Sequence, residues 1–279
     1  MSATLENRFY DLYTEYFHRA EATRRWNILN DIPWDLARKE VPDYIPYIVE
    51  SFCAVELYLP DYTSKILQLV RRSRGRAWFQ ANWGYEESKH SLVLEEWLVR
   101  SGNRTRQEVT DFADTVLANE WNLGFDSPRK MIIYTMFQEL ATGMNYRKLR
   151  ERALEAGDEA LGTALQFLTK DEAAHHSFFR DGVKIFMDED RDGTLCDLAE
   201  VLANFEMPAQ EVIPDWESRG KRIVAEKIFS DRIFLRHVVR PILNNLDVTR
   251  EELKELSKST KQVDPEAEDP YADSLAVAV

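Results

Sequence analysis

The chain has 279 residues, 44% of them hydrophobic and 30% charged, and its formal net charge at pH 7 is −13. This balance is typical of a globular protein with a sizeable core, and the acidic charge excludes nucleic acid as a main partner because a phosphate backbone is bound by basic surfaces. Ten glycines and ten prolines leave too few turns for an all-β fold. The composition therefore favours long helices.

The N-terminal part, about residues 1–40, is predicted to form a helical arm. It lacks an apolar core of signal-peptide length, and the chain has no apolar run of about 18 residues, so the sequence predicts no membrane span. The two cysteines, Cys53 and Cys196, lie far apart and predict free thiols. Together these features predict a cytoplasmic protein.

Four long segments then carry apolar residues at the spacing of a helix face. They span about 44–73, 76–101, 127–157 and 159–187. Pro60 is predicted to break the first segment, and Asp158 is predicted to cap the last. Capping boxes at Thr105–Glu108 and Thr249–Glu252 predict two further helix starts, and Ser127-Pro128 predicts the start of the third long helix.

Beyond the long segments, shorter helices are predicted near residues 194–206 and 216–243. Residues 259–279 are polar, acidic and interrupted by prolines, a composition that predicts a disordered tail. The expected organisation is therefore a single domain over residues 1–258, including the N-terminal arm, followed by this tail.

Two Glu-x-x-His motifs fall inside the long helical segments. Glu87 precedes His90 in the second segment, and Glu172 precedes His175 in the fourth. At this spacing a carboxylate and an imidazole share one helix face, one turn apart. Either motif alone is weak, because exposed Glu–His pairs at this spacing occur in many helices.

The motifs become informative because they belong to a repeat. Glu56 lies 31 residues before Glu87, and Glu139 lies 33 residues before Glu172, each in an apolar helical segment of its own. One Glu from each of two helices and one Glu-x-x-His from each of two others is the ligand pattern of a paired-metal site in a bundle core. The sequence thus predicts an all-α protein, a four-helix bundle with additional flanking helices.

The charges of the repeated residues support this interpretation. Two divalent ions carry a charge of +4 and four glutamates carry −4, so the cluster is neutral and compatible with an apolar core. Oxygen and nitrogen ligands without thiolate suit iron or manganese. The six candidate ligands are Glu56, Glu87, His90, Glu139, Glu172 and His175.

The segments around these ligands carry further motifs. The sequence Val-Glu-Leu-Tyr-Leu-Pro-Asp-Tyr contains Glu56, and Trp83–His90 reads Trp-Gly-Tyr-Glu-Glu-Ser-Lys-His. Tyr134–Thr142 reads Tyr-Thr-Met-Phe-Gln-Glu-Leu-Ala-Thr, and Asp171–His175 contains Asp-Glu-x-x-His. With these motifs the chain resembles the soluble acyl-[acyl carrier protein] desaturases, a ferritin-like di-iron family, over about residues 20–215.

The resemblance implies roles for particular residues. The six candidate ligands would bind two iron ions, Fe2+ in the reduced enzyme, with Glu87 and Glu139 as bridging or shifting carboxylates. A relay from Trp26 through Asp171 to His90 would carry electrons to the cluster.

Two neighbouring positions are less determined by the resemblance. Thr142 is similar to a family threonine near the oxygen-binding side, although a threonine in a helix also commonly bonds a helix carbonyl. His176 follows a ligand directly and is expected at the helix surface rather than as a third imidazole ligand.

The resemblance also implies an activity. The protein would be an O2-dependent desaturase of fatty acid biosynthesis that forms a double bond in an acyl chain carried on acyl carrier protein. It would work as a homodimer and receive electrons from an external donor such as ferredoxin, since the chain has no flavin or nicotinamide motif.

Other di-iron functions remain open. The main alternative is another di-iron oxygenase, a hydroxylase or N-oxygenase, which would need a wider and more polar pocket. A radical-generating subunit of ribonucleotide reductase would need a tyrosine beside the cluster, for which Tyr85 and Tyr134 are candidates, and a ferritin-like storage protein would be shorter.

Two surfaces follow from the desaturase interpretation. Acyl carrier proteins are strongly acidic, so docking needs a basic patch, and the candidate is the segment Arg71-Arg72-Ser-Arg74-Gly-Arg76 between the first two long segments. The acyl chain needs an apolar channel along the bundle. Residues that either line this channel or belong to the plain core are Met136, Phe137, Met144, Phe178 and Phe179.

Overall fold

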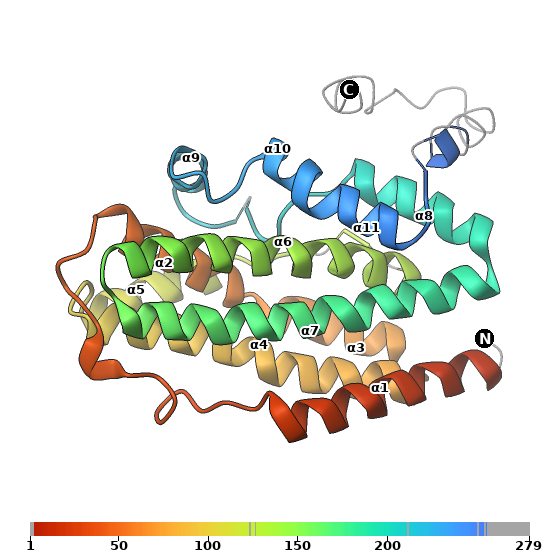
Figure 1. Ribbon diagram of the computed structural model, residues 1–279, viewed down its shortest axis with the longest axis horizontal. Helices are drawn as coiled ribbons and strands as arrows, with labels where there is room; N and C mark the ends of the chain where they lie inside the picture. The colour runs from red at the N-terminus through yellow and green to blue at the C-terminus, as the bar shows by residue number, and fades with distance from the viewer. Residues whose placement is uncertain are drawn as a thin grey trace.

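The computed structural model describes residues 3–122, 124–125, 127–210, 212–249, 251–253 and 255 (Figure 1). Over these residues the protein is helical and contains no strand. The elements are α1 (Ala3–Thr23), the 3-10 turn η1 (Trp34–Leu36), α2 (Tyr44–Glu56), α3 (Leu59–Val70), α4 (Arg74–Arg100), α5 (Arg106–Leu117), α6 (Pro128–Glu155), α7 (Glu159–Glu189), α8 (Arg191–Ala203), α9 (Trp216–Ala225), α10 (Asp231–Phe234), the π-helical turn η2 (Leu235–Val239) and α11 (Arg240–Asn245).

The core is a four-helix bundle formed by α4, α6, α7 and the pair α2 and α3. Figure 1 shows the long helices running side by side, with α1 along the outside of α4 and α7. The chain turns between α6 and α7 at Gly157, whose φ of +77° is accessible to glycine without strain. The adjacent Asp158 caps α7 as predicted, since its carboxylate accepts from the Leu161 N–H at 2.8 Å. The bundle predicted from the repeat is therefore present.

The other predicted helix boundaries are largely confirmed. The first long segment is broken as predicted, since α2 ends at Glu56 and Pro60 lies in the first turn of α3. Both capping boxes form, with the Thr105 N–H donating to Glu108 and the Thr249 N–H donating to Glu252, each at 2.7 Å. Local sequence signals thus fix where most helices start.

The prediction of one helix over residues 216–243 is wrong. Helix α9 ends at Ala225, and the backbone reverses at Lys227, which has a φ of +56°. Helical structure begins again after Ser230, whose hydroxyl accepts from the Ile233 N–H at 3.3 Å, and continues through α10, η2 and α11. In Figure 1 these pieces lie across the side of the bundle formed by α2 and α6. The break creates a lid of short helices over that side.

The N-terminal arm is helical over α1 only, and it approaches α4 closely. A Cβ atom on Gly75 would lie 2.4 Å from the carbonyl carbon of Phe9, so only glycine permits this approach. Next to it, the buried Arg76 guanidinium pairs with Glu6 at 2.7 Å. Arg76 therefore serves the packing of α1, and the predicted basic patch is reduced to its exposed neighbours.

Three further predictions concern the chain as a whole. None of the helices in the described ranges is long and apolar enough to cross a membrane. Cys53 and Cys196 are free thiols, as predicted. The predicted tail, residues 259–279, lies outside the described residues.

Candidate metal centre

The six predicted ligands meet inside the bundle. Glu56 comes from the last turn of α2, and Glu139 from the middle of α6. The two Glu-x-x-His motifs come from α4 and α7, so that each of the four helices contributes to one cluster. All six side chains are buried, none more than 6% exposed.

The ligand atoms form two groups in which every atom lies within 4.8 Å of the others. The first group contains Glu56 and His90, and the second contains Glu139 and His175. Both groups also contain Glu87 and Glu172. Glu87 and Glu172 are therefore common to both groups, whereas Glu139 belongs to the second group only.

Both imidazole rings present the same nitrogen to the carboxylates. Nδ1 of His90 lies 3.2 Å from Glu87 and 3.3 Å from Glu172. Nδ1 of His175 lies 2.9 Å from Glu87 and 3.1 Å from Glu139. In each ring Nε2 points away from the cluster, which leaves Nδ1 to coordinate a cation.

The cluster fits two divalent cations and is poorly satisfied by hydrogen bonds alone. Among the described residues, buried atoms that make no hydrogen bond include both nitrogens of His90, both carboxylate oxygens of Glu172 and one oxygen each of Glu87 and Glu139. Buried polar groups are normally paired, so such a concentration of unpaired acceptors calls for cations. The oxygen and nitrogen donors suit iron or manganese.

Burial and mutual repulsion shift the pKa values of these groups. Burial, reinforced by the charge of Glu87, raises the pKa of Glu56 well above its usual value. Burial and the neighbouring Glu172 raise the pKa of Glu139 in the same way. Burial alone would lower the pKa of His90, but the surrounding carboxylates raise it well above its usual value. Without cations, protons must therefore take part in neutralising the cluster.

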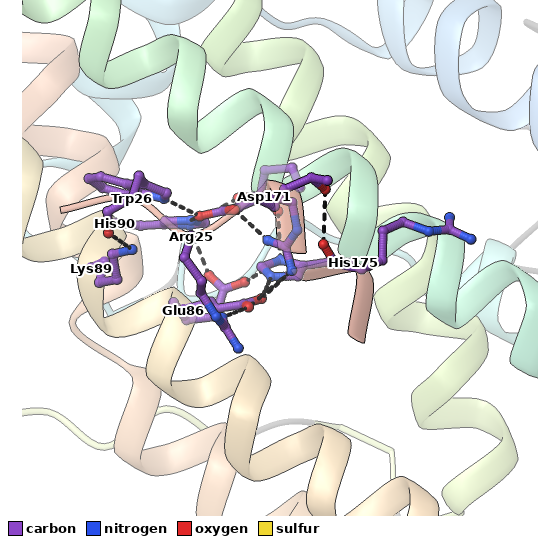
Figure 2. A network of polar contacts seen from close by, with 12 residues as sticks. Arg25, Trp26, Glu86, Lys89, His90, Asp171 and His175 are labelled. Carbon is purple, nitrogen blue, oxygen red and sulfur yellow. Dashed lines mark hydrogen bonds and ion pairs between the residues drawn. The ribbon is translucent and has the colours of Figure 1, made fainter. Parts of the chain in front are cut away.

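A carboxylate faces the outer nitrogen of each imidazole (Figure 2). Asp171 lies 3.5 Å from Nε2 of His90 and accepts from the indole N–H of Trp26 at 2.7 Å. The predicted sequence of Trp26, Asp171 and His90 is thus contiguous in space. Such a partner fixes the orientation of a metal-binding imidazole.

Glu86 was not predicted and plays the matching part for the other imidazole. Nε2 of His175 donates to Glu86 at 2.8 Å. Burial opposes ionisation of Glu86, but the hydrogen bond from His175 and the charge of Arg24 lower its pKa well below the usual range. A signal was available in the sequence, because an acidic residue directly precedes the ligand glutamate in both motifs, Glu86-Glu87 and Asp171-Glu172.

A cavity of about 350 Å³ lies between α2, α6 and the lid helices and reaches the cluster at Glu56. Thr142 lines it as well, and its hydroxyl accepts from the Gln138 side chain at 3.3 Å. The Tyr146 hydroxyl, also at the cavity, donates to Glu56. The apolar lining residues include Phe52, Val55, Met207, Pro208, Ile223, Val224 and Phe229.

The residues predicted to line an acyl channel are not those that line this cavity. Phe178 and Phe179 instead border a space of only about 20 Å³ between α3, α4, α6 and α7. Met136, Phe137 and Met144 belong to the buried core. Helical spacing identified these residues as interior without separating a cavity from the core, because the cavity is completed by residues 207–210 and 216–231.

Other residues predicted near the cluster have other surroundings or partners. Tyr85 is 57% exposed, and the Tyr134 hydroxyl donates to the carbonyl of Glu206. His176 is half-buried, and its Nδ1 bonds the Met136 carbonyl at 2.9 Å, so it is neither a surface residue nor a third imidazole of the cluster. Burial lowers the pKa of His176.

A helical bundle whose core joins four carboxylates and two imidazoles defines the class of paired-metal bundle proteins. Within that class, the chain belongs to the fatty acid desaturase family, because the model of that family matches residues 34–265. The resemblance inferred from the ligand motifs is thereby confirmed.

Individual relatives agree with the family. The chain is 25% identical over 220 residues to DesA1 of Mycobacterium tuberculosis, assigned by its name as an acyl-[acyl-carrier-protein] desaturase. It is 26% identical over 181 residues to the chloroplastic stearoyl-[acyl-carrier-protein] 9-desaturase of Solanum commersonii. These alignments cover 75% and 61% of this chain. The chain spans 63% of the length of DesA1 and 46% of the plant enzyme.

A solved structure shows the same architecture. The X-ray structure of DesA2 from Mycobacterium tuberculosis H37Rv, assigned by its title as an acyl-ACP desaturase, superposes with a TM-score of 0.65 at 17% identity. The match covers 91% of this chain and 99% of that one. The predicted fold class, a ferritin-like four-helix bundle with flanking helices, is confirmed.

Proposed function

We propose that the protein is a di-iron, O2-dependent desaturase that forms a double bond in a saturated fatty acyl chain carried on acyl carrier protein. The observation that carries the proposal is the contact between an apolar cavity and the metal-binding cluster: Glu56 belongs to both. An acyl chain in this cavity would lie beside the cluster at one end. The names of the relatives support acyl carrier protein as the carrier.

The six clustered side chains would hold two iron ions, and Glu87 and Glu172 belong to both groups of ligand atoms. The bound ions would supply the oxidising power that removal of hydrogen from an unactivated methylene pair requires, because no side chain abstracts a proton from such a carbon. An external donor of the ferredoxin type would deliver electrons, as the chain has no flavin or nicotinamide motif. Trp26 and Asp171 form the candidate route inward.

The chain's own residues position and protect the reacting groups. The Asp171 carboxylate faces Nε2 of His90, so the proton stays on that nitrogen and Nδ1 remains available to a cation. The Tyr146 hydroxyl holds the Glu56 carboxylate at the inner end of the cavity. Thr142 supplies a hydroxyl at the same place. The apolar walls exclude water from this end.

The cavity opens where Val224, 53% exposed, and the exposed Asp231 form its rim. Close to these two residues in the sequence lie the exposed basic residues Lys227 and Arg232. Arg71 and Arg72 lie instead at the end of α3, toward the end of the bundle that carries the N-terminus and away from α9 (Figure 1). We therefore place carrier docking at α9 and α10 and not at the predicted patch, with a homodimer formed elsewhere on the bundle.

The proposal is tested with iron-loaded protein, reduced ferredoxin, O2 and saturated acyl carrier protein of several chain lengths, followed by mass analysis of the acyl group. Desaturation removes two mass units. A gain of sixteen mass units would show hydroxylation and would replace the desaturase proposal with the oxygenase alternative. Glu139→Gln should abolish the reaction, whereas Glu151→Gln, an exposed glutamate of the same helix, should leave it unchanged.

A further inference from the structure

Arg24 lies between the two carboxylates that face the outer nitrogens of the imidazoles. Its Nη1 donates to Asp171, and its Nη2 donates to Glu86 at 3.0 Å. The Arg24 side chain is only 13% exposed, and both carboxylates are almost completely buried. One guanidinium thus contacts the partners of both imidazoles at once.

The two carboxylates are crossed between the halves of the repeat. Asp171 belongs to α7 but faces His90 of α4, whereas Glu86 belongs to α4 but accepts from His175 of α7. Each half of the bundle therefore orients the imidazole of the other half. Arg24, which comes from neither helix, connects the two crossings.

We propose that Arg24 is a positioning residue that couples the two metal positions, because its planar fork holds Glu86 and Asp171, and through them both imidazoles, in one arrangement. The proposal rests on the proposed metal centre. A guanidinium presents its N–H donors at fixed angles, so two carboxylates bound to it cannot reorient independently. Outer partners of this kind are known to control the affinity of metal ligands.

The charges of Glu86 and Asp171 are matched by the two arginines that face them. Arg24 and Arg25 contribute +2 and face the two carboxylates, which contribute −2. The charge of the four glutamates of the cluster would then be neutralised by the two cations. Of the two carboxylates, Arg25 contacts Glu86 but not Asp171. It does so from a more exposed position and also bonds Asn82 at 2.8 Å. Arg25 is therefore the natural control for a residue that reaches both carboxylates.

The N-terminal arm supplies the rest of the layer. The Tyr16 hydroxyl donates to Glu86 and accepts from Arg24 at 2.6 Å. The Trp26 carbonyl accepts from the ammonium of Lys89, which holds the end of the arm against α4. Tyr16, Arg24 and Trp26 all precede residue 34, where the family match begins. The coupling is thus a property of a segment beyond that match.

The experiment compares anaerobic Co2+ titrations of the wild-type protein with those of Arg24→Gln, Arg24→Lys and Arg25→Gln. Optical absorption gives the affinity and number of ions. Hyperfine-shifted resonances of the Nε2–H protons report the contact of His90 with Asp171 and that of His175 with Glu86 separately. Arg24→Gln should lower the affinity for both Co2+ ions by about 10- to 100-fold and speed solvent exchange of both Nε2–H protons. Arg25→Gln should change the ion affinity and the Nε2–H exchange at His175 only.

The conservative variant separates geometry from charge. Arg24→Lys keeps the positive charge but lacks the fork, so it should restore the ion affinity of at most one of the two metal positions. It also provides a folded variant for comparison if the Arg24→Gln protein fails to fold. Full restoration by lysine, or a change at one position only in Arg24→Gln, would overturn the coupling. Wild-type protein that binds no ions would contradict the proposed function instead, which keeps the two failures distinct.

Discussion

The two halves of the bundle carry the same ligands in different surroundings. In the N-terminal half, α2 ends at Glu56, and the Tyr146 hydroxyl and the cavity meet its carboxylate. In the C-terminal half, α6 continues unbroken past Glu139, which is completely buried and faces His175. The repeat therefore specifies a symmetric cluster, and the chain outside the repeat makes it accessible from one side.

This difference separates binding from reaction. Cation binding requires both halves, since each group of ligand atoms draws on both Glu-x-x-His motifs through Glu87 and Glu172. In the proposed function, the substrate would approach only from the side where α2 breaks and the lid covers the cavity. Three kinds of change test this difference between the two halves. In order of decreasing expected effect, they are removal of a shared ligand, a change in the protonation of the cluster, and substitution at the cavity rim.

The largest effect is expected when a shared ligand is removed. Glu172→Gln should lose both ions, because this carboxylate belongs to both groups, whereas Glu139→Gln should retain the ion on the Glu56 side. Activity should fall by more than about 100-fold in each case, beyond what outer partners cost. Elemental analysis of anaerobically loaded protein gives the ions per chain. Equal loss of ions in both variants would contradict unequal sharing.

Much of this cluster was predictable from the sequence. The repeat identified the six ligands because a helix places residues three apart on one face, and the cap signals fixed most helix starts. Glu86 was missed because its role depends on an imidazole 89 residues away, and only the geometry of the bundle brings the two together. The only local sequence signal for Glu86 was the acidic residue that precedes the ligand glutamate in both motifs.

The cavity could not be predicted in the same way. The walls that complete it opposite α2 and α6 come from residues 207–210 and 216–231, and this part of the chain reverses its direction at Lys227. A lysine with a positive φ gives no sequence signal comparable to glycine. Apolar periodicity therefore identified an interior without showing which part of it was hollow.

An intermediate effect is expected from pH on the metal-free protein. The pKa values of Glu56, Glu139, His90 and His175 are all raised in the folded state. The pKa values of Glu172, Glu86 and Asp171 are lowered, so above about pH 6 these groups are ionised in both states and do not contribute. The folded chain then binds more protons than the unfolded chain, so its stability falls as the pH rises through the raised values. Between pH 6 and pH 8 the Tm of chelator-treated protein should fall, by about 2–4 °C per kcal/mol lost.

Metal loading provides the control for this trend. Cations replace the protons of the cluster, so binding should release protons and the loaded protein should lose much of the pH dependence. Calorimetric scans of both forms at each pH make the comparison. A Tm of the metal-free protein that rises over this range would contradict the raised pKa values as the source of the effect.

The smallest effect is expected at the cavity rim. The double variant Lys227→Glu and Arg232→Glu should raise KM for acyl carrier protein by about tenfold, because like charges at a docking surface cost on the order of 1 kcal/mol. The matched control Arg71→Glu and Arg72→Glu changes the net charge equally at the other end of the bundle. Its KM should stay near the wild-type value at moderate ionic strength, where distant charges are screened.

The outcome decides which end of the bundle receives the carrier. An increase confined to the rim variant, and removed at high salt, supports entry beside α9 and α10. An increase confined to Arg71 and Arg72 would require the acyl chain to enter near the turn between α3 and α4. The cavity that reaches Glu56 opens at Val224 and not at that turn, so such a result would separate docking from the only ligand in contact with both cavity and cluster.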